Sequence, residues 1–166
     1  MSNSIICEDP LCWEDVDEII EGKLYAGPTP AWIRKPPPQK IDIIFRLHAE
    51  EMQPIDVTNL SANTRTEAWG IRDCSDEKEA AIDVEKLNKI VDHLRFHLRA
   101  KRRVYVHCMQ GVSRTSLVLA AFFMKVKKLP VMAALREVGK KRPCIRPNGF
   151  FLQLLRKYQQ HLGISE

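Results

Sequence analysis

104-VYVHCMQGVSRT-115 is the stretch on which the fold and the chemistry of this protein depend. Its first three residues, Val104–Val106, are apolar and β-branched at both ends, which predicts a short buried strand. From Arg114 to Val126 the sequence is apolar on nearly all sides, which predicts a central buried helix. Between Cys108 and Arg114 the backbone must turn sharply, and Gly111 supplies the conformational freedom for that turn.

A loop that enters a helix N-terminus directs successive backbone N–H groups into one concavity. These groups and the helix dipole together favour an anion of phosphate size. The loop residues in this position are Met109, Gln110, Gly111, Val112 and Ser113. Arg114 can close the concavity with a planar, permanently charged side chain that binds two oxygens at once. We therefore expect residues 109–114 to bind a phosphate group.

Cys108 lies at the base of this expected phosphate site. The same amides and the Arg114 guanidinium also stabilise a thiolate, the reactive form of cysteine. Thiolate attack on phosphorus gives a phosphocysteine, which divides one difficult hydrolysis into two easier steps. Thr115, or alternatively Ser113, can donate a hydroxyl hydrogen bond to the departing sulfur, and we expect His107 to order the loop. A buried structural cysteine is the competing interpretation, but it does not explain the arginine and threonine that follow.

Strands and helices alternate along the rest of the chain. Apolar runs predict strands at 23–27, 41–47 and 68–71, and apolar residues at helical spacing predict helices at 80–99, from Pro130 to near Gly139, and from Pro147 onward. The proline run 35–38 and the polar stretch 58–66 are expected to be loops. The alternation predicts an α/β layered domain.

The composition is that of a globular protein with an uneven charge distribution. The 166 residues carry a formal net charge of +5, yet the first 21 are acidic and much of the positive charge lies between Arg95 and Lys157. A basic second half can attract phosphorylated substrates, nucleic acid or an acidic membrane surface. No apolar run is long enough to predict a membrane span. Five cysteines without metal-ligand spacing suggest free thiols and a cytoplasmic, or also nuclear, location.

The pattern His107-Cys108-x5-Arg114-Thr115 resembles the signature of the cysteine-dependent protein tyrosine phosphatases, and HCMQGVSRTS is similar to that of the small atypical dual-specificity phosphatases. The segments 23–27, 71–76 and 142–150 resemble the first strand of that family, its general-acid loop and the start of its last helix.

This resemblance extends over roughly residues 24–160. It implies a central, mostly parallel sheet flanked by helices and the hydrolysis of phosphotyrosine and phosphoserine or phosphothreonine in proteins, without a metal or cofactor. We accordingly expect an acidic N-terminal extension at 1–20 and a single catalytic domain at 21–163.

Two aspartates are candidates for the general acid that the resemblance implies. The family's spacing to the nucleophile favours Asp76, whereas the position directly after a predicted strand favours Asp73. We prefer Asp73 and keep Asp76 as the alternative. The aspartate that is not the acid is expected to cap a helix.

Three other functions share this signature. Phosphoinositide phosphatases of the superfamily tend to carry lysines in the loop, where this chain has Met109 and Gln110. RNA 5′-phosphatases would use the basic half, but no aromatic-rich basic stretch resembles a base-stacking surface, so we expect no obligate nucleic acid. A non-catalytic phosphate-binding pseudophosphatase typically lacks the cysteine, the arginine or the acid, and each has a candidate here.

Several side chains outside the loop have two interpretations. Cys74 or Cys144 could form a reversible disulfide with Cys108, or be an ordinary free thiol. Asn148 could hydrogen-bond to the loop or cap the last helix, and Trp32 could pack internally or border the substrate entrance.

Overall fold

The computed structural model describes residues 9–37, 39–49, 63–74 and 76–166. Within these residues one five-stranded sheet has the order β1-β2-β5-β3-β4. The strands are β1 (Asp17–Ile20), β2 (Leu24–Gly27), β3 (Ile43–His48), β4 (Arg65–Ile71) and β5 (Val104–His107). Only the β1–β2 pair is antiparallel among these strands. The mostly parallel α/β fold expected from the sequence is therefore confirmed.

Strand β5 lies at the centre of the sheet, between β2 and β3. Its last residue, His107, is paired with Gly27 on one side and with Arg46 on the other. Because these strands are parallel, their carboxyl ends meet at one edge of the sheet. The loop that follows His107 therefore starts at the edge where open α/β sheets bind their ligands.

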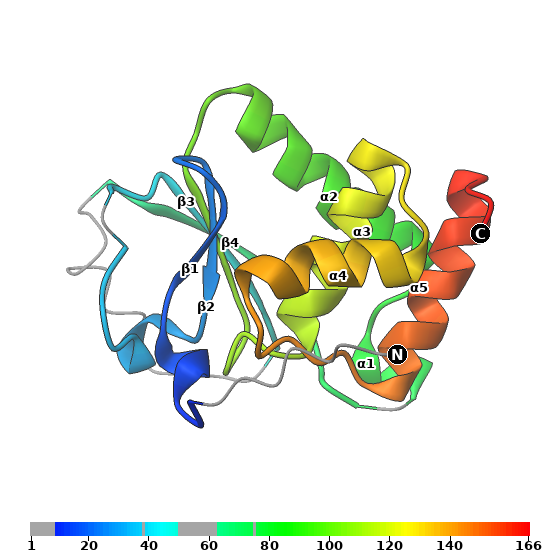
Figure 1. The fold of residues 1–166 in the computed structure, drawn as a ribbon, viewed down its shortest axis with the longest axis horizontal. Helices are drawn as coiled ribbons and strands as arrows, with labels where there is room; N and C mark the ends of the chain where they lie inside the picture. Colours follow the sequence, from blue (N-terminus) through cyan, green and yellow to red (C-terminus); the bar gives the residue numbers. More distant parts are fainter. Residues whose placement is uncertain (1–8, 38, 50–62, 75) are drawn as a thin grey trace.

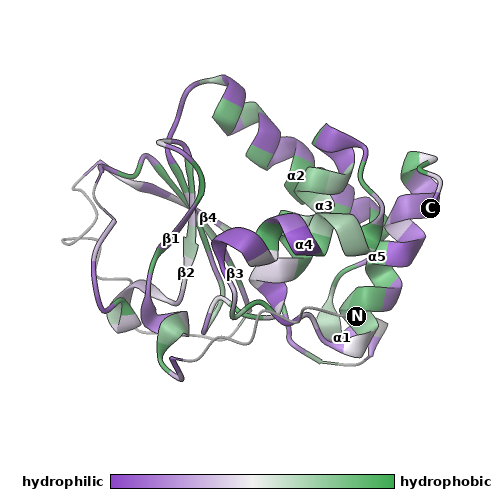
Figure 2. Cartoon of the chain, in the orientation of Figure 1, coloured by the Kyte–Doolittle hydropathy of each residue, from purple (hydrophilic) through white to green (hydrophobic). Residues whose placement is uncertain are grey.

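The helices lie together on one side of the sheet (Figure 1). They are α1 (Glu77–Ala80), α2 (Val84–Arg99), α3 (Arg114–Lys127), α4 (Val131–Lys141) and α5 (Gly149–Leu162). All residues of α3 from Arg114 to Met124 are buried, as expected for a central helix. Hydrophilic residues, purple in Figure 2, lie along the outer sides of α2 and α4.

Alternate residues of the central strands belong to two separate hydrophobic clusters. Val104 and Val106 belong to the main core beneath the helices, whereas Tyr105 belongs to a smaller cluster with Tyr25 and Ile44. This alternation follows from the period of two residues in a strand. Both faces of the sheet centre are consequently buried, which fixes the position of the loop after β5.

The structure corrects several predicted boundaries. The helix predicted at 80–99 begins at Val84, because Ala81 is left-handed and the Asp83 carboxylate caps the start of α2. Ala80 is instead the last residue of α1. The strand predicted at 68–71 begins at Arg65, and most of the loop predicted at 58–66 lies outside the described residues. Helix α4 continues to Lys141, so Gly139 lies inside the helix and is not its cap.

Part of the predicted N-terminal extension belongs to the sheet. Asp17–Ile20 forms the edge strand β1 and follows a short 3-10 turn, η1 (Cys12–Glu14). Residues 1–8 lie outside the described residues. A second 3-10 turn, η2 (Pro30–Trp32), follows β2. In the described part of the chain, no helix combines the length and apolarity that crossing a membrane requires.

Candidate active site

Cys108 lies directly after β5, and Thr115 lies in the first turn of α3. The Thr115 hydroxyl donates a hydrogen bond to Cys108 Sγ at 3.2 Å. Both residues are buried, with Cys108 only 3% exposed. The loop thus brings the predicted nucleophile and the predicted hydroxyl donor into direct contact. Ser113, the alternative donor, directs its hydroxyl to the Asp73 carboxylate instead.

The loop between them has its carbonyl groups bonded to other parts of the protein. Each carbonyl from Cys108 to Ser113 accepts a hydrogen bond, in order from His107 Nδ1, Thr29 N, Arg142 Nη2, Arg142 Nε, Arg146 N and Ser116 Oγ. In a trans peptide unit the N–H points away from the C=O. The N–H groups of residues 109–114 therefore point away from the partners of these carbonyl groups. Backbone N–H groups that are left facing a loop in this way can bind an anion.

Gly111 is required in this loop for two reasons. Its φ of 70° lies in the left-handed region, which residues with a Cβ rarely adopt. A Cβ at this position would also lie 2.3 Å from the Gly27 carbonyl oxygen and 2.7 Å from Arg142 Nη2. The turn can therefore approach β2 only because position 111 has no side chain.

Arg114 is the first residue of α3, and its side chain is held in place by the end of a strand. Its Nη1 donates a 3.0 Å hydrogen bond to the Ile71 carbonyl, at the carboxyl end of β4. The residue is nearly completely buried and, like Cys108, lines a pocket at the carboxyl edge of the sheet, the candidate catalytic pocket. Arg114 is thus held in the wall of the pocket that also contains Cys108.

His107 orders the loop as a neutral side chain. Its Nδ1 lies 2.9 Å from the Cys108 carbonyl oxygen, which can only accept, so this nitrogen carries the proton. Burial lowers the pKa of His107 from 6.5 to about 3. The ring also stacks on Tyr105, with the ring centroids 5.6 Å apart. His107 is therefore a fixed donor to the loop.

The structure separates the two candidate acids. Asp73 lines the pocket with Cys108, and its Oδ1 accepts hydrogen bonds from Ser113 Oγ at 2.9 Å and Asn148 Nδ2 at 2.7 Å. Asp76 caps α1 instead, because its Oδ1 accepts from the first backbone N–H groups of that helix at 2.9 and 3.1 Å. Only Asp73 is therefore placed where a leaving group could reach it.

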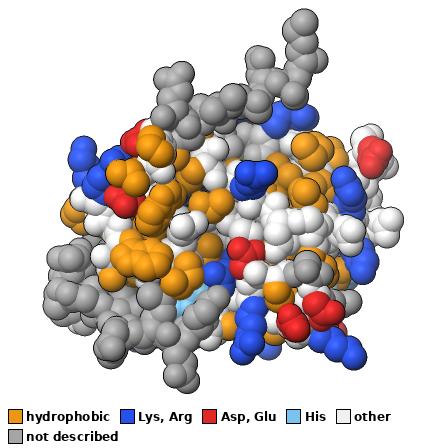
Figure 3. Space-filling model, turned by 90° about the horizontal axis from the view of Figure 1, so that it is seen from below, with side chains coloured by type: hydrophobic (Ala, Val, Ile, Leu, Met, Phe, Trp, Pro, Cys, Tyr) orange, Lys and Arg blue, Asp and Glu red, His pale blue; other side chains and the backbone are white. Residues whose placement is uncertain are grey.

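The catalytic pocket has a volume of about 450 Å³. Of the predicted residues it contains Asp73, Cys108, Met109, Gln110, Val112, Ser113 and Arg114. Trp32, Arg146, Pro147 and Asn148 complete its lining. Figure 3 shows this end of the molecule, where hydrophobic side chains (orange) lie next to Lys and Arg side chains (blue).

Two residues combine the alternative roles considered for them. Trp32 lines the pocket and also packs edge-on against Trp13, with the ring centroids 6.0 Å apart. Asn148 caps α5 by accepting from Phe151 N at 2.8 Å, and its amide donates to Asp73. Each residue therefore connects the pocket to a packed element behind it.

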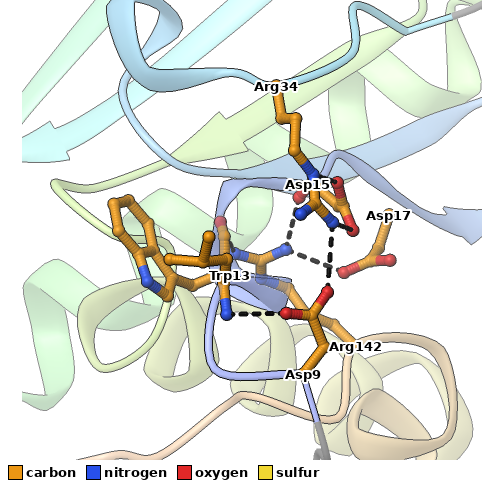
Figure 4. A network of polar contacts seen from close by, with 7 residues as sticks. Asp9, Trp13, Asp15, Asp17, Arg34 and Arg142 are labelled. Atoms are coloured by element: carbon orange, nitrogen blue, oxygen red, sulfur yellow. Dashed lines mark hydrogen bonds and ion pairs between the residues drawn. The ribbon is translucent and has the colours of Figure 1, made fainter.

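Arg142 is a site residue that the sequence did not reveal. Its side chain is completely buried and donates to the Gln110 and Gly111 carbonyls of the loop at 3.0 and 2.8 Å. It also donates to the Trp13 and Asp15 carbonyls and to the Asp17 carboxylate (Figure 4).

This buried arginine connects the N-terminal segment to the catalytic loop. Burial raises the pKa of the Asp17 carboxyl above its usual range, and the positive charge of Arg142 opposes that shift. In the sequence, Arg142 is one cation among many in a basic region, and no spacing marks it. Its role depends on contacts that only the fold creates.

The cysteines differ from one another in their state. Cys74, Cys108 and Cys144 are free thiols, whereas Cys12 is disulfide-bonded, contrary to our expectation of free thiols throughout. The Cys74 thiol contacts the backbone carbonyls of Arg72 and Asp76. Burial raises the pKa of the Cys144 thiol, which disfavours its reactive form. Across the described ranges, no group of His, Cys, Asp and Glu side chains is arranged to hold a metal ion.

Comparison with known proteins identifies the family. Residues 24–161 match the dual specificity phosphatase catalytic domain. The tyrosine-protein phosphatase yvh1 of Schizosaccharomyces pombe is 32% identical over 116 residues, which make up 70% of this chain and 33% of that protein. This chain spans less than two thirds of the length of the curated relatives that it matches.

Solved structures agree in fold at lower identity. Human DUSP28 superposes with a TM-score of 0.71 at 19% identity, covering 89% of this chain and 95% of that one. PTPMT1 in complex with PI(5)P superposes with a TM-score of 0.70 at 15% identity, covering 89% and 96%. Because the family match covers most of the chain, including the loop after β5 and the segment that carries Asn148, the chain belongs to the dual specificity phosphatase catalytic domain family.

Proposed function

We propose that this chain is a cysteine-dependent protein phosphatase that hydrolyses phosphotyrosine and phosphoserine or phosphothreonine through a phosphocysteine intermediate. The observation that carries this proposal is the hydrogen bond from Thr115 Oγ1 to Cys108 Sγ, in the pocket that also contains Arg114 and Asp73. A cysteine that only fills the core does not require a hydroxyl donor at its sulfur. It also does not require an arginine and a carboxylate in the same cavity.

In the first step the phosphate binds to the loop N–H groups and to the Arg114 guanidinium. The Cys108 thiolate attacks phosphorus, forming a P–S bond while the bond to the leaving oxygen breaks. That oxygen takes a proton from Asp73. Ser113 and Asn148 both donate to Oδ1 of Asp73, so we assign the transferred proton to Oδ2.

In the second step water replaces the cysteine. The Asp73 carboxylate accepts a proton from the water, whose oxygen attacks phosphorus while the P–S bond breaks. The departing thiolate is stabilised by the Thr115 hydroxyl and the loop amides, and inorganic phosphate is released. The cycle returns Asp73 to its protonated form and leaves Cys108 as the thiolate.

Two observations support a protein substrate over a phosphoinositide. Met109 and Gln110 line the pocket where phosphoinositide phosphatases tend to carry lysines, so Arg146 is the one cation in its described lining besides Arg114. The phosphoinositide-bound neighbour shares the fold at 15% identity, so its ligand does not transfer to this chain. Trp32 adds an aromatic wall, which suits the ring of phosphotyrosine.

The test is the hydrolysis of a small aryl phosphate and of a phosphopeptide in the presence of a chelator. We expect the wild-type protein to be active on both and Cys108→Ser to be inactive. Asp73→Asn should lower phosphopeptide hydrolysis by about 100-fold, within the range that general acids contribute. The effect on the aryl phosphate should be smaller, because its leaving group is already acidic.

Asp76→Asn is the matched control for Asp73→Asn. It removes a charge from the same segment, at the cap of α1 and outside the pocket. Activity close to wild type is expected for this variant. If Asp76→Asn abolished the basic limb of the pH profile while Asp73→Asn retained it, the assignment of the acid would be wrong. A wild-type protein that binds vanadate but turns over no substrate would favour the pseudophosphatase.

A further inference from the structure

A second groove lies next to the catalytic pocket, between α4 and the segment that leads into α5. Its volume is about 490 Å³. Arg146 and Pro147 line both the groove and the catalytic pocket, so the two hollows meet at these residues. A chain that is bound through its phosphate can therefore continue into the groove.

The wall of this groove is largely apolar. Met132 and Leu135 contribute from α4, and Ile145 contributes from the following segment. Met132 is 56% exposed, which is unusual for a large apolar side chain. Methionine is flexible and polarisable, and it adapts to irregular apolar partners. The wall therefore provides a binding surface for an apolar side chain.

Positive charges surround this apolar wall. Arg136, Lys140 and Arg146 line the groove, and none of its described lining residues is acidic. The nearest acid on the same helix, Glu137, pairs with Lys127 at 3.4 Å and with Lys140 at 3.2 Å. The charge of the rim therefore complements an acidic partner and disfavours a basic one.

Gly139 lines the groove without a side chain. It lies inside α4, where glycine is less favourable than alanine by about 1 kcal/mol. A Cβ built on Gly139 meets no atom within 4 Å, so neither packing nor backbone conformation requires glycine there. The absent side chain leaves space in the lining of the groove.

We propose that this groove binds the part of a protein substrate next to its phosphorylated residue, with a preference for an apolar side chain beside an acidic one. The inference rests on the proposed phosphatase function and specifies its substrate class. An extended peptide advances about 3.3 Å per residue, so the preferred pair should lie within about four residues of the phosphorylated residue.

The test compares phosphotyrosine peptides that carry Leu-Glu, or the neutral pair Ser-Gln, at positions two to four on either side. We expect wild-type kcat/KM to be about tenfold higher for one of the Leu-Glu peptides. Arg136→Glu combined with Lys140→Glu should remove this preference by raising KM. Gly139→Leu, which fills the groove, should do the same, and circular dichroism should show its helix content unchanged.

Lys89→Glu is the matched control, because it reverses an exposed charge on α2, a helix that contributes no residue to the groove. It should leave the preference intact, and no groove variant should change hydrolysis of a small aryl phosphate. Equal kcat/KM for all peptides, with aryl phosphate still hydrolysed, would overturn the groove assignment and leave the phosphatase function standing.

Two other results would also overturn it. The variant Arg136→Glu with Lys140→Glu could slow the hydrolysis of a soluble phosphoinositide and leave the hydrolysis of every peptide unchanged. In that case the groove would bind a lipid headgroup. If the wild-type protein failed to hydrolyse even the aryl phosphate, the proposed function itself would fail, and the inference with it.

Discussion

At the scale of single residues, Thr115 is the side chain most directly involved in the second step of the proposed mechanism. Its hydroxyl lies 3.2 Å from Cys108 Sγ, and Thr115 is fully buried. A hydrogen bond to a charged group contributes about 1.5–3 kcal/mol. Thr115 should therefore matter most when the sulfur leaves as a thiolate.

We predict that Thr115→Ala lowers kcat by about 10- to 100-fold, the change in rate that corresponds to this energy. Because the second step slows more than the first, rapid mixing with an aryl phosphate should show a burst of phenol followed by slow turnover. Thr115→Ser keeps the hydroxyl and should retain most of the activity. A slow variant without a burst, or one that serine does not rescue, would contradict this role.

His107 gives a residue-scale prediction of how stability depends on pH. Its pKa is about 3 in the folded protein, against 6.5 for a free histidine. Between these values the unfolded chain binds more protons than the folded one, so stability falls as the pH is lowered from 6.5 towards 3. Between pH 7 and pH 4.5 this residue alone should account for about 2–3 kcal/mol of lost stability.

His107→Asn tests this prediction, because the amide can donate to the Cys108 carbonyl but does not titrate. The free energy of unfolding, measured in urea at pH 7 and pH 4.5, should fall less in the variant by about 2–3 kcal/mol. The comparison cancels the contributions of the other titrating groups. The same pH dependence in both proteins would mean that His107 is not buried as a neutral side chain.

At the scale of elements, Arg142 joins three segments: β1 with the turn before it, the catalytic loop and the end of α4. It supplies donors to four backbone carbonyls and to the Asp17 carboxylate. Removing one member of a buried ion pair typically costs 3–5 kcal/mol, because the remaining charge is left without a partner. The loop conformation and the edge strand therefore depend on one side chain.

We predict that Arg142→Met lowers the free energy of unfolding by about 3–5 kcal/mol. Arg142→Lys keeps the charge next to Asp17 but cannot reach both sides, so it should restore stability better than activity. Arg136→Met, an exposed position on the same helix, is the control. In a double-mutant cycle, Asp17→Asn should cost less in the Arg142→Met background than in the wild type. Additive effects would show that the two side chains are not coupled.

The sequence patterns did not predict the start of α2 or the presence of β1. The apolar spacing over 80–99 predicts a helix from Ala80, but the left-handed Ala81 and the Asp83 cap place its start at Val84, which a pattern of apolar residues does not detect. Strand β1 is short and acidic, so it lacks a strand signal. It forms because β2 offers a free edge to pair with.

At the scale of the whole molecule, residues far apart in sequence meet at the carboxyl edge of the sheet. Asp73 and Ser113 are 40 residues apart, and Arg142 and Trp13 are 129 residues apart. The catalytic pocket and the adjoining groove both depend on such contacts. A substitution that loosens α4 should therefore affect the shared wall at Arg146 and Pro147 as well as the groove.

The sequence by itself determined the strand–loop–helix unit, predicted from Val104 to Val126, and the positions of Cys108, Arg114 and Thr115 within it. These features depend on local backbone geometry: a buried strand, a glycine turn and a helix start within a few residues of each other. Tertiary structure alone decided that Asp73 and not Asp76 borders the pocket, that Arg142 holds the loop, and that Gly139 lines a groove beside the pocket. Those outcomes depend on distances between separate elements, and these distances exist only once the core has packed.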